Sequence, residues 1–359
     1  MIQKRVLANG VTVLLEEIPH VKSAAIGVFV KVGSKHEPEE FNGISHFIEH
    51  MMFKGTETKS ARQIAELFEE MGGQLNAYTS KEHTCFYARV LDENLYTAMD
   101  VLFDMLFNSA MNEKDVDTER GVIIEEINLC EDSPDELVHD LFSQTIMAGH
   151  ALGRPILGCE DIIATLSRET IKEYYRFYYH PTNMVIAVVG NINSVKVLDR
   201  LVTYQGYGPS PKMTEVSMPP QLTSGVNLIP RDIEQVQICL GVPGIPYTDD
   251  RRFTQNVMNN ILGGGISSHL FQKLREEKGL AYSVFSYPST YKETGTYAIY
   301  IGTGPNKIQE FFVLLRDELD RFIREGVAFE EVQRTQNQIK ASLYLGMESV
   351  MTRMNRLGK

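Results

Sequence analysis

Two histidines and a glutamate stand close together in the stretch His46-Phe47-Ile48-Glu49-His50. On a helix, residues three and four positions apart lie on one face, so His46, Glu49 and His50 share a face. The residues around them are apolar, and burying two imidazoles and a carboxylate there is costly unless something pairs with them. Zinc binds imidazole nitrogen, and a catalytic zinc site keeps one position open for water. The order His-x-x-Glu-His is also a named metallopeptidase motif. We therefore predict a zinc site in which Glu49 accepts the proton of a catalytic water, rather than two core histidines beside a surface glutamate.

A third ligand must come from elsewhere in the chain, because two histidines alone do not hold a catalytic zinc. The helix predicted at 113–131 contains three candidates, Glu119, Glu125 and Glu126. Glu119 and Glu126 are seven residues apart and share a face, whereas Glu125 points about 100° away from Glu126. On spacing alone, the choice between Glu125 and Glu126 stays open. The alternative interpretation of this helix is a solvated acidic face.

Hydrophobic periodicity predicts the elements that must position these residues. The pattern indicates strands at 11–15, 24–30, 74–80, 84–90 and 184–189. It indicates a helix that carries the motif after Gly43, and further helices at 60–71, 92–108, 113–131, after Pro134 and at 168–179.

The segment 204–225 is rich in proline and glycine and predicts a linker between a first domain, 1–203, and a second domain, 226–359. After it, the order strand, strand, helix, helix, strand, strand, helix occurs a second time, beginning with a strand at 225–230 that echoes 10–15. We infer two similar α+β domains from one duplicated unit. The second copy lacks His-x-x-Glu-His, so we expect one metal site per chain.

Composition limits the function classes. The 359 residues are 43% hydrophobic and 23% charged, which is typical of a soluble globular protein with room for two domains. A net charge of −12 argues against nucleic-acid binding, and no apolar run is long enough for a membrane span. The four cysteines lie far apart, and Met1–Arg5 leads into a strand without a signal-peptide core. We therefore expect a cytoplasmic protein.

Three motifs together resemble one peptidase family. His46-x-x-Glu49-His50 is followed by Phe53-Lys54-Gly55-Thr56, then by Gly72-Gly73-x-x-Asn76-Ala77-Tyr78-Thr79, and then by Glu119-Arg120-x-Val122-x-x-Glu125-Glu126-Ile127. This set resembles the pitrilysin/insulinase-type (M16) zinc peptidases with the inverted motif. The chain is most similar to the half-length members that resemble the mitochondrial processing peptidase beta subunit, and the resemblance covers essentially its whole length.

The resemblance implies roles for individual residues. Glu126 matches the family's third zinc ligand, and Glu119 matches a glutamate associated with catalysis. In the second domain, Arg275 and Tyr282 match the family's substrate-binding pair, although a surface ion pair and a core tyrosine are the alternative. The strand that contains Asn76 and Ala77 offers an edge to which an extended substrate can add, with Asn76 positioning it near the zinc.

The resemblance also implies a fold and an activity. Each domain is expected to be a mainly antiparallel sheet with helices packed on one face, and the two together form half of a clamshell. The implied activity is that of a zinc metalloendopeptidase, with one Zn²⁺ per chain, acting on peptides or unfolded segments in a chamber enclosed by a homodimer or by a heterodimer with a similar chain. The alternative is a non-catalytic scaffold or substrate-guiding subunit. Because relatives run a few tens of residues longer, we expect the second domain to be incomplete at its C-terminus, with apolar surface left uncovered.

Overall fold

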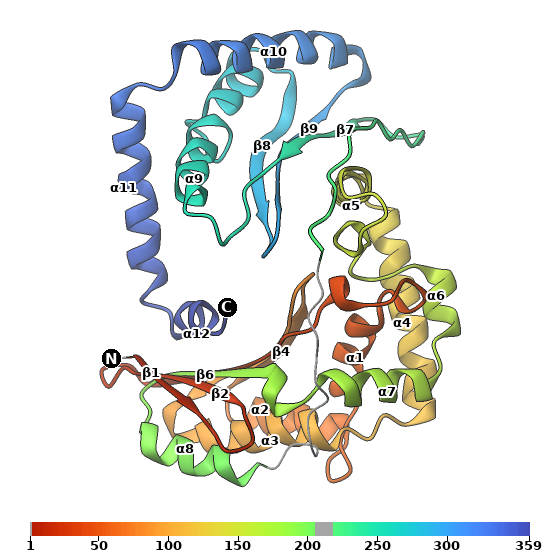
Figure 1. Cartoon of the computed structure of the whole chain (residues 1–359), viewed down its shortest axis with the longest axis vertical. Coiled ribbons are helices and arrows are strands. Elements are labelled where there is room, and N and C mark those ends of the chain that lie inside the picture. Colours follow the sequence, from red (N-terminus) through yellow and green to blue (C-terminus); the bar gives the residue numbers. More distant parts are fainter. Residues whose placement is uncertain (1, 205–217) are drawn as a thin grey trace. The chain divides into compact units, whose positions relative to one another are not determined.

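The computed structural model describes residues 2–204 and 218–359, and these residues form two compact units (Figure 1). Unit 1 comprises residues 2–128, 154–204 and 344–359, and unit 2 comprises residues 129–153 and 218–343. Each unit therefore contains a short segment from the other half of the sequence.

Unit 1 is built on a six-stranded sheet with the order β1-β2-β6-β3-β5-β4. Its strands are β1 (Ile2–Val6), β2 (Thr12–Glu17), β3 (Ser23–Val30), β4 (Gln74–Thr79), β5 (Thr84–Leu91) and β6 (Met184–Gly190). β6 enters between β2 and β3, parallel to β2 and antiparallel to β3, and every other pairing in the sheet is antiparallel. β4 lies at one end of the order, and among the described residues it pairs only with β5, so it is an edge strand.

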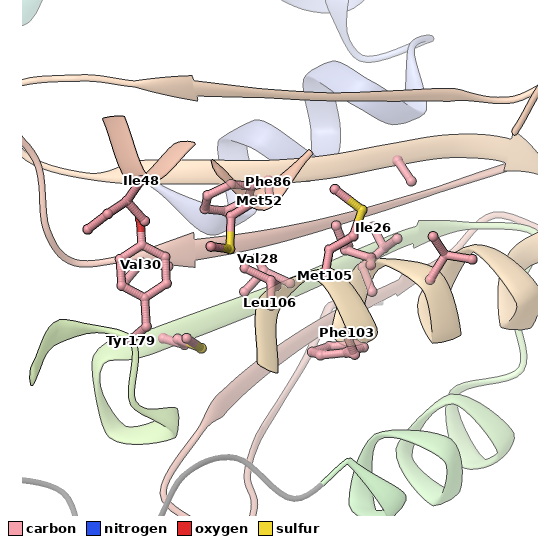
Figure 2. Close-up of a cluster of buried hydrophobic side chains, with 14 of the residues drawn as sticks. Ile26, Val28, Val30, Ile48, Met52, Phe86, Phe103, Met105, Leu106 and Tyr179 are labelled. Carbon is pink, nitrogen blue, oxygen red and sulfur yellow. The ribbon is translucent and has the colours of Figure 1, made fainter. Parts of the chain in front are cut away.

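Most helices of unit 1 are associated with one face of this sheet, where the main hydrophobic core lies. They are α1 (Ile44–Met52), α2 (Ala61–Glu70), α3 (Leu95–Asn108), α4 (Glu113–Glu131), α6 (Glu160–Thr165), α7 (Arg168–Tyr178) and α8 (Ser194–Thr203). Figure 2 shows Ile26 and Val28 of β3 beside Met105 and Leu106 of α3, with Met52 of α1 in the same cluster. This packing holds α1 against the sheet.

The opposite face of the same sheet is covered by the last helix of the chain, α12 (Val350–Gly358). Val350 and Met354 pack with Ala25 and Phe29, which belong to a cluster separate from the main core. Strand β3 is covered on both faces, which explains why its sequence is almost continuously apolar. The expectation that helices cover one face thus describes most of unit 1, but α12 packs on the other face.

Unit 2 has a smaller, wholly antiparallel sheet with the order β7-β9-β8. Its strands are β7 (Val236–Pro243), β8 (Ala281–Thr290) and β9 (Gly295–Thr303), and its helices are α5 (Pro134–Ile146), α9 (Arg251–Leu262), a π-helix (Phe271–Glu277), α10 (Ile308–Glu325) and most of α11 (Phe329–Gly346). Apart from the first strand, this order reproduces the one expected from the repeat, so the α+β class with antiparallel-rich sheets and two similar units is confirmed.

The strand expected at 225–230 is not formed. These residues are exposed and have no regular secondary structure, and they belong to no ladder among the described residues. The apolar pattern was read correctly as strand-like, but a strand also needs a hydrogen-bonding neighbour. In unit 1 the corresponding strand, β2, has β6 as that neighbour.

The compact units do not follow the expected boundaries of 1–203 and 226–359. Residues 129–153, which include α5, belong to unit 2, and residues 344–359, which include α12, belong to unit 1. A linear pattern cannot show that a helix packs on a sheet built from distant strands. Of the expected linker at 204–225, residues 205–217 lie outside the described residues. None of the helices within 2–204 and 218–359 combines the length and the hydrophobicity that a bilayer span requires.

Candidate metal centre

Helix α1 carries its two histidines on one side and packs against the hydrophobic core with the other. Phe47, Ile48 and Met51 are fully buried in the core. Because a helix repeats every 3.6 residues, this apolar stripe directs His46 and His50 to the opposite side.

The start of α1 is fixed by a glycine and by a buried carboxylate. Gly43 has φ +97, and a Cβ there would meet the carbonyl oxygen of Leu157 at 2.6 Å. Glu37 accepts hydrogen bonds from the backbone N–H groups of Gly43 (2.7 Å) and Ser45 (2.9 Å) and from the Asn42 side chain (2.9 Å). Burial raises the pKa of Glu37, and these hydrogen bonds act against that shift. A carboxylate at a helix N-terminus also complements the helix dipole.

We expect Glu37→Gln to lower the free energy of unfolding of unit 1 by about 2 kcal/mol, since hydrogen bonds to a buried charged acceptor are among the stronger ones. The amide also places a donor where two backbone donors now converge. Urea unfolding, followed by hydrogen exchange of α1, measures the change. Glu40→Gln is the matched control because Glu40 is exposed three residues later, and equal stability of the two variants would contradict this role for Glu37.

Three potential ligands converge where α1 and α4 face one another. The ligand atoms of His46, His50 and Glu126 all lie within 4.8 Å of one another. Oε2 of Glu126 is 3.7 Å from Nε2 of His46 and 3.6 Å from Nε2 of His50. Among the residues that the structure describes, this is the one such group of three. The structure thus separates the two glutamates that spacing left open, because Glu126 joins the histidines whereas Glu125 is exposed.

These separations suit a shared ion better than direct hydrogen bonds. A nitrogen–oxygen hydrogen bond spans roughly 2.7–3.2 Å, which is shorter than either distance to Glu126. Two ligands bound to zinc at about 2.0–2.1 Å and at a tetrahedral angle stand roughly 3.3 Å apart. Burial lowers the pKa of His46 to about 4, and repulsion from His50 adds to the shift, so His46 is neutral at pH 7 as a metal ligand must be. The donor set fits Zn²⁺.

Glu119 supports His50 from the side away from Glu126. Its Oε2 is 3.0 Å from Nδ1 of His50, and its Oε1 is 2.6 Å from Nζ of Lys54. Glu119 is 2% exposed, so its carboxylate is largely shielded from water. A proton on Nδ1 that is donated to Glu119 leaves the Nε2 lone pair of His50 available for a metal. The structure therefore places Glu119 next to a candidate ligand, not within the candidate ligand set.

Glu49 is held by the edge strand. Its Oε2 accepts a hydrogen bond of 2.5 Å from Oγ1 of Thr79, at the end of β4. Burial raises the pKa of Glu49, while the Thr79 hydrogen bond and nearby His50 lower it and Glu126 raises it. A carboxylate with a raised pKa beside a metal site is suited to accept and return a proton.

The predicted substrate residues lie in both units. Asn76 is exposed on β4 and Ala77 is half-buried opposite Phe86 of β5. In unit 2, the Arg275 guanidinium carbon lies 5.2 Å from the centre of the Tyr282 ring, and Tyr282 is 78% exposed. Tyr282 is therefore not a core tyrosine.

Three supporting residues were missed by sequence reasoning: Glu37, Lys54 and Thr79. Lys54 carried a weak signal, since it lies four residues after His50 on the same face. Thr79 stands in one of the family motifs but was given no role, and Glu37 carried no signal, because a loop glutamate has no spacing that ties it to α1.

Comparisons with known proteins identify the same peptidase family in both halves of the chain. The family model "Insulinase (Peptidase family M16)" matches residues 12–160, and the model "Peptidase M16 inactive domain" matches residues 165–339, the half without the histidine motif. An uncharacterized zinc protease of Bacillus subtilis (strain 168), YmxG, is 45% identical over 359 residues, covering 100% of this chain and 88% of the relative. An uncharacterized zinc protease of Streptomyces coelicolor is 40% identical over 366 residues, covering 100% of this chain and 80% of the relative.

A crystal structure of a protease from Helicobacter pylori has the same fold, with a TM-score of 0.90 at 23% identity, covering 98% of this chain and 87% of that one. At 23% identity the structural similarity shows only that the fold is the same. Membership of the family is shown by the two family models and by the sequence relatives. The motif, the fold and the sequence matches lead to one family, and this chain belongs to the insulinase family of peptidases, family M16.

Proposed function

We propose that this chain is a zinc metalloendopeptidase that hydrolyses peptides or unfolded segments, with one zinc held by His46, His50 and Glu126. The observation that carries the proposal is the convergence of these three ligand atoms beside Glu49. Family membership and the zinc-protease names of its relatives support it.

Zinc bound there would supply Lewis acidity, which polarises a scissile carbonyl and acidifies water. Glu49 accepts a proton as water oxygen attacks the carbonyl carbon. As the carbon–nitrogen bond breaks, Glu49 returns that proton to the leaving amine, so one water is consumed for each peptide bond cleaved. Thr79 orients the Glu49 carboxyl group through its hydrogen bond. Glu119 holds the His50 ring in the orientation that directs Nε2 toward Glu126.

One experiment tests this function. We expect the purified chain to contain close to one zinc per chain and to cleave a quenched-fluorescent basic peptide. A chelator should abolish cleavage, and added zinc should restore it. Bound zinc without any cleavage, together with cleavage once a sister protein is added, would favour the substrate-guiding subunit instead. Absence of zinc binding would refute the metal site itself.

The β4 edge is our proposed site for the peptide backbone. No strand in the described part of the chain pairs with the outer side of β4, so the N–H and C=O groups there can bind an added strand. Asn76 is exposed on this strand, three residues before Thr79, which contacts Glu49. Arg275 and Tyr282 would contribute further substrate contacts from unit 2, as the family resemblance implies.

We expect Asn76→Ala to lower kcat/KM about five- to tenfold, the effect of about one lost hydrogen bond, without changing zinc content. Gln74→Ala is the matched control, since Gln74 is exposed two residues earlier on the same face of β4. Steady-state kinetics with the fluorescent peptide measures both variants. If the two variants lose activity equally, Asn76 has no special role in substrate binding.

We further propose that the active form is a dimer, either of this chain or with a similar chain, because the half-length relatives it resembles enclose their substrate between two chains. Light scattering on a size-exclusion column should give twice the mass of one chain. A monomer that retains full activity would contradict the proposal.

A further inference from the structure

One histidine of unit 2, His269, lies just before the π-helix and contacts a glutamate on each of two other helices. Its Nδ1 is 2.8 Å from Oε1 of Glu318 on α10, and its Nε2 is 2.7 Å from Oε1 of Glu331 on α11. Both distances are those of hydrogen bonds. The imidazole of His269 therefore joins the start of the π-helix to α10 and to α11.

Both contacts together require the protonated form of the ring. A carboxylate accepts hydrogen bonds and does not donate them, and a neutral imidazole has one N–H, whereas a protonated imidazole has two. If His269 were neutral, one of its nitrogens would turn a lone pair toward a carboxylate oxygen. The two hydrogen bonds of His269 thus depend on a proton that the ring can lose.

The groups on α10 that face His269 favour the positive charge. Glu318 is 3% exposed, and its Oε1 also accepts a hydrogen bond of 2.6 Å from Nη2 of Arg321, whose side chain is 49% exposed. The ring of Phe322 lies edge-on to the imidazole, with the ring centres 5.3 Å apart, and carries no charge. A buried carboxylate such as Glu318 needs the cation that protonated His269 supplies.

The group that faces His269 from α11 is also a carboxylate. Burial acts to raise the pKa of Glu331, but hydrogen bonds from the backbone N–H of Ala328 and from His269, with the charges of His269 and Arg334, lower it on balance. Glu331 is therefore ionised at neutral pH. On the π-helix itself, Lys273 and Glu277 form an ion pair of 2.7 Å with each other.

The corresponding position of unit 1 holds a lysine. Lys59 and His269 each stand seven residues after the end of a corresponding helix, α1 or α9. Lys59 pairs with Asp104 of α3 at 3.3 Å, as His269 pairs with Glu318 of α10. Lysine stays charged at physiological pH, whereas histidine titrates near neutrality. Unit 2 thus has a titratable cation where unit 1 has a permanent one.

The helix that follows His269 carries Arg275, one of the two residues of unit 2 to which the family resemblance assigns substrate contact. Arg275 lies over the ring of Tyr282, also in unit 2. π-helices are rare and occur frequently at functional sites, so a seven-residue one depends on its tertiary contacts. Leu270 and Leu274 provide apolar contacts in the core, and His269 provides the polar ones.

We propose that His269 is a proton-dependent positioning residue, which fixes the π-helix and Arg275 for substrate binding while it is protonated and releases them as the pH rises. Its effect on the substrate rests on the proposed peptidase function, whereas the structural change does not. Substrate affinity changes and the chemical step does not, because every residue involved belongs to unit 2 and the metal-site residues belong to unit 1.

Hydrogen exchange of residues 269–277 in the 359-residue chain tests the structural change without any need for activity. After correction for the intrinsic pH dependence of exchange, protection of this segment should fall about tenfold from about pH 6 to about pH 8.5, the effect of about one hydrogen bond to a charged group. Protection of α3 in unit 1 should not change. His269→Lys introduces the permanent cation of unit 1 and should keep its protection at both pH values, whereas His269→Gln should be less protected at both. His20→Lys is the matched control, since His20 is an exposed histidine of unit 1, and it should behave as the parent.

Cleavage of the fluorescent peptide tests the effect on the substrate. The KM of the parent, divided by the KM of His269→Lys at the same pH, should rise about fivefold over this range, with kcat equal in the two proteins. Protection that is independent of pH in the parent, or that falls equally in His269→Lys, would overturn the proposal. A constant KM ratio beside the expected exchange result would overturn the positioning role. Failure of every variant to cleave would refute the proposed function, and hydrogen exchange would still decide whether the proton of His269 holds the π-helix.

Discussion

Glu49→Gln should bind zinc as the parent chain does and lose about 10²–10⁴-fold in kcat, the range that general acid–base catalysis contributes. The change keeps the size of the side chain, and its amide oxygen can still accept the hydrogen bond from Thr79. It removes the group that takes and returns the proton. Because Glu49 is not one of the three converging ligands, the metal site should be unaffected.

The measurement pairs zinc content with steady-state cleavage of the fluorescent peptide. Glu125→Gln makes the same chemical change at an exposed glutamate of α4 and should leave both quantities unchanged. If Glu49→Gln retained more than about a tenth of the parent kcat, proton transfer by Glu49 would be ruled out. Loss of zinc from this variant would instead move Glu49 into the ligand set.

The sequence placed the candidate metal-site residues of α1 on one face because local helix geometry is enough to do so. The i, i+3 and i, i+4 spacing brings His46, Glu49 and His50 to one face, and the apolar residues between them decide which face is buried. The structure shows that arrangement, with Phe47 and Ile48 in the core.

The third carboxylate could not be derived from spacing, since it depends on how α4 is rotated against α1. Neighbouring residues on a helix differ by about 100°, so either Glu125 or Glu126 satisfied the local pattern. Ile123 and Ile127 are buried in the core, and this rotation leaves Glu126 facing the histidines. The packing of α4 against the core therefore determines that Glu126, and not Glu125, faces the histidines.

Other features depend on contacts between distant parts of the chain. α12 was assigned to the second domain by its position in the sequence, but it packs on β3 and β6 of unit 1. Residues 225–230 have a strand pattern without a strand neighbour. A sequence pattern shows which secondary structure a segment can adopt, but whether a strand forms, or which sheet a helix packs on, depends on residues far away in the sequence.

Glu126→Ala should lower zinc affinity by more than about 100-fold and abolish cleavage at ordinary zinc concentrations. Removing a residue that only supports a ligand already costs about 10- to 100-fold in metal affinity, and loss of a ligand should cost more. The two histidines would remain, but two nitrogens do not complete a catalytic zinc site. The Glu126 side chain is 45% exposed, so its loss should not destabilise the fold as a core truncation would.

Two neighbours on the same helix make this prediction specific. Glu125→Ala should bind zinc normally because Glu125 is exposed and outside the group of three. The zinc affinity of Glu119→Gln should lie between those of Glu126→Ala and Glu125→Ala, with a loss of about 10- to 100-fold, because Glu119 contacts Nδ1 of His50 and not the other ligands. Competition with a chromogenic chelator gives all three affinities on one scale. The expected loss of zinc affinity is largest for the Glu126 variant, smaller for the Glu119 variant and absent for the Glu125 variant. A larger loss for Glu125→Ala than for Glu126→Ala would make Glu125 the third ligand.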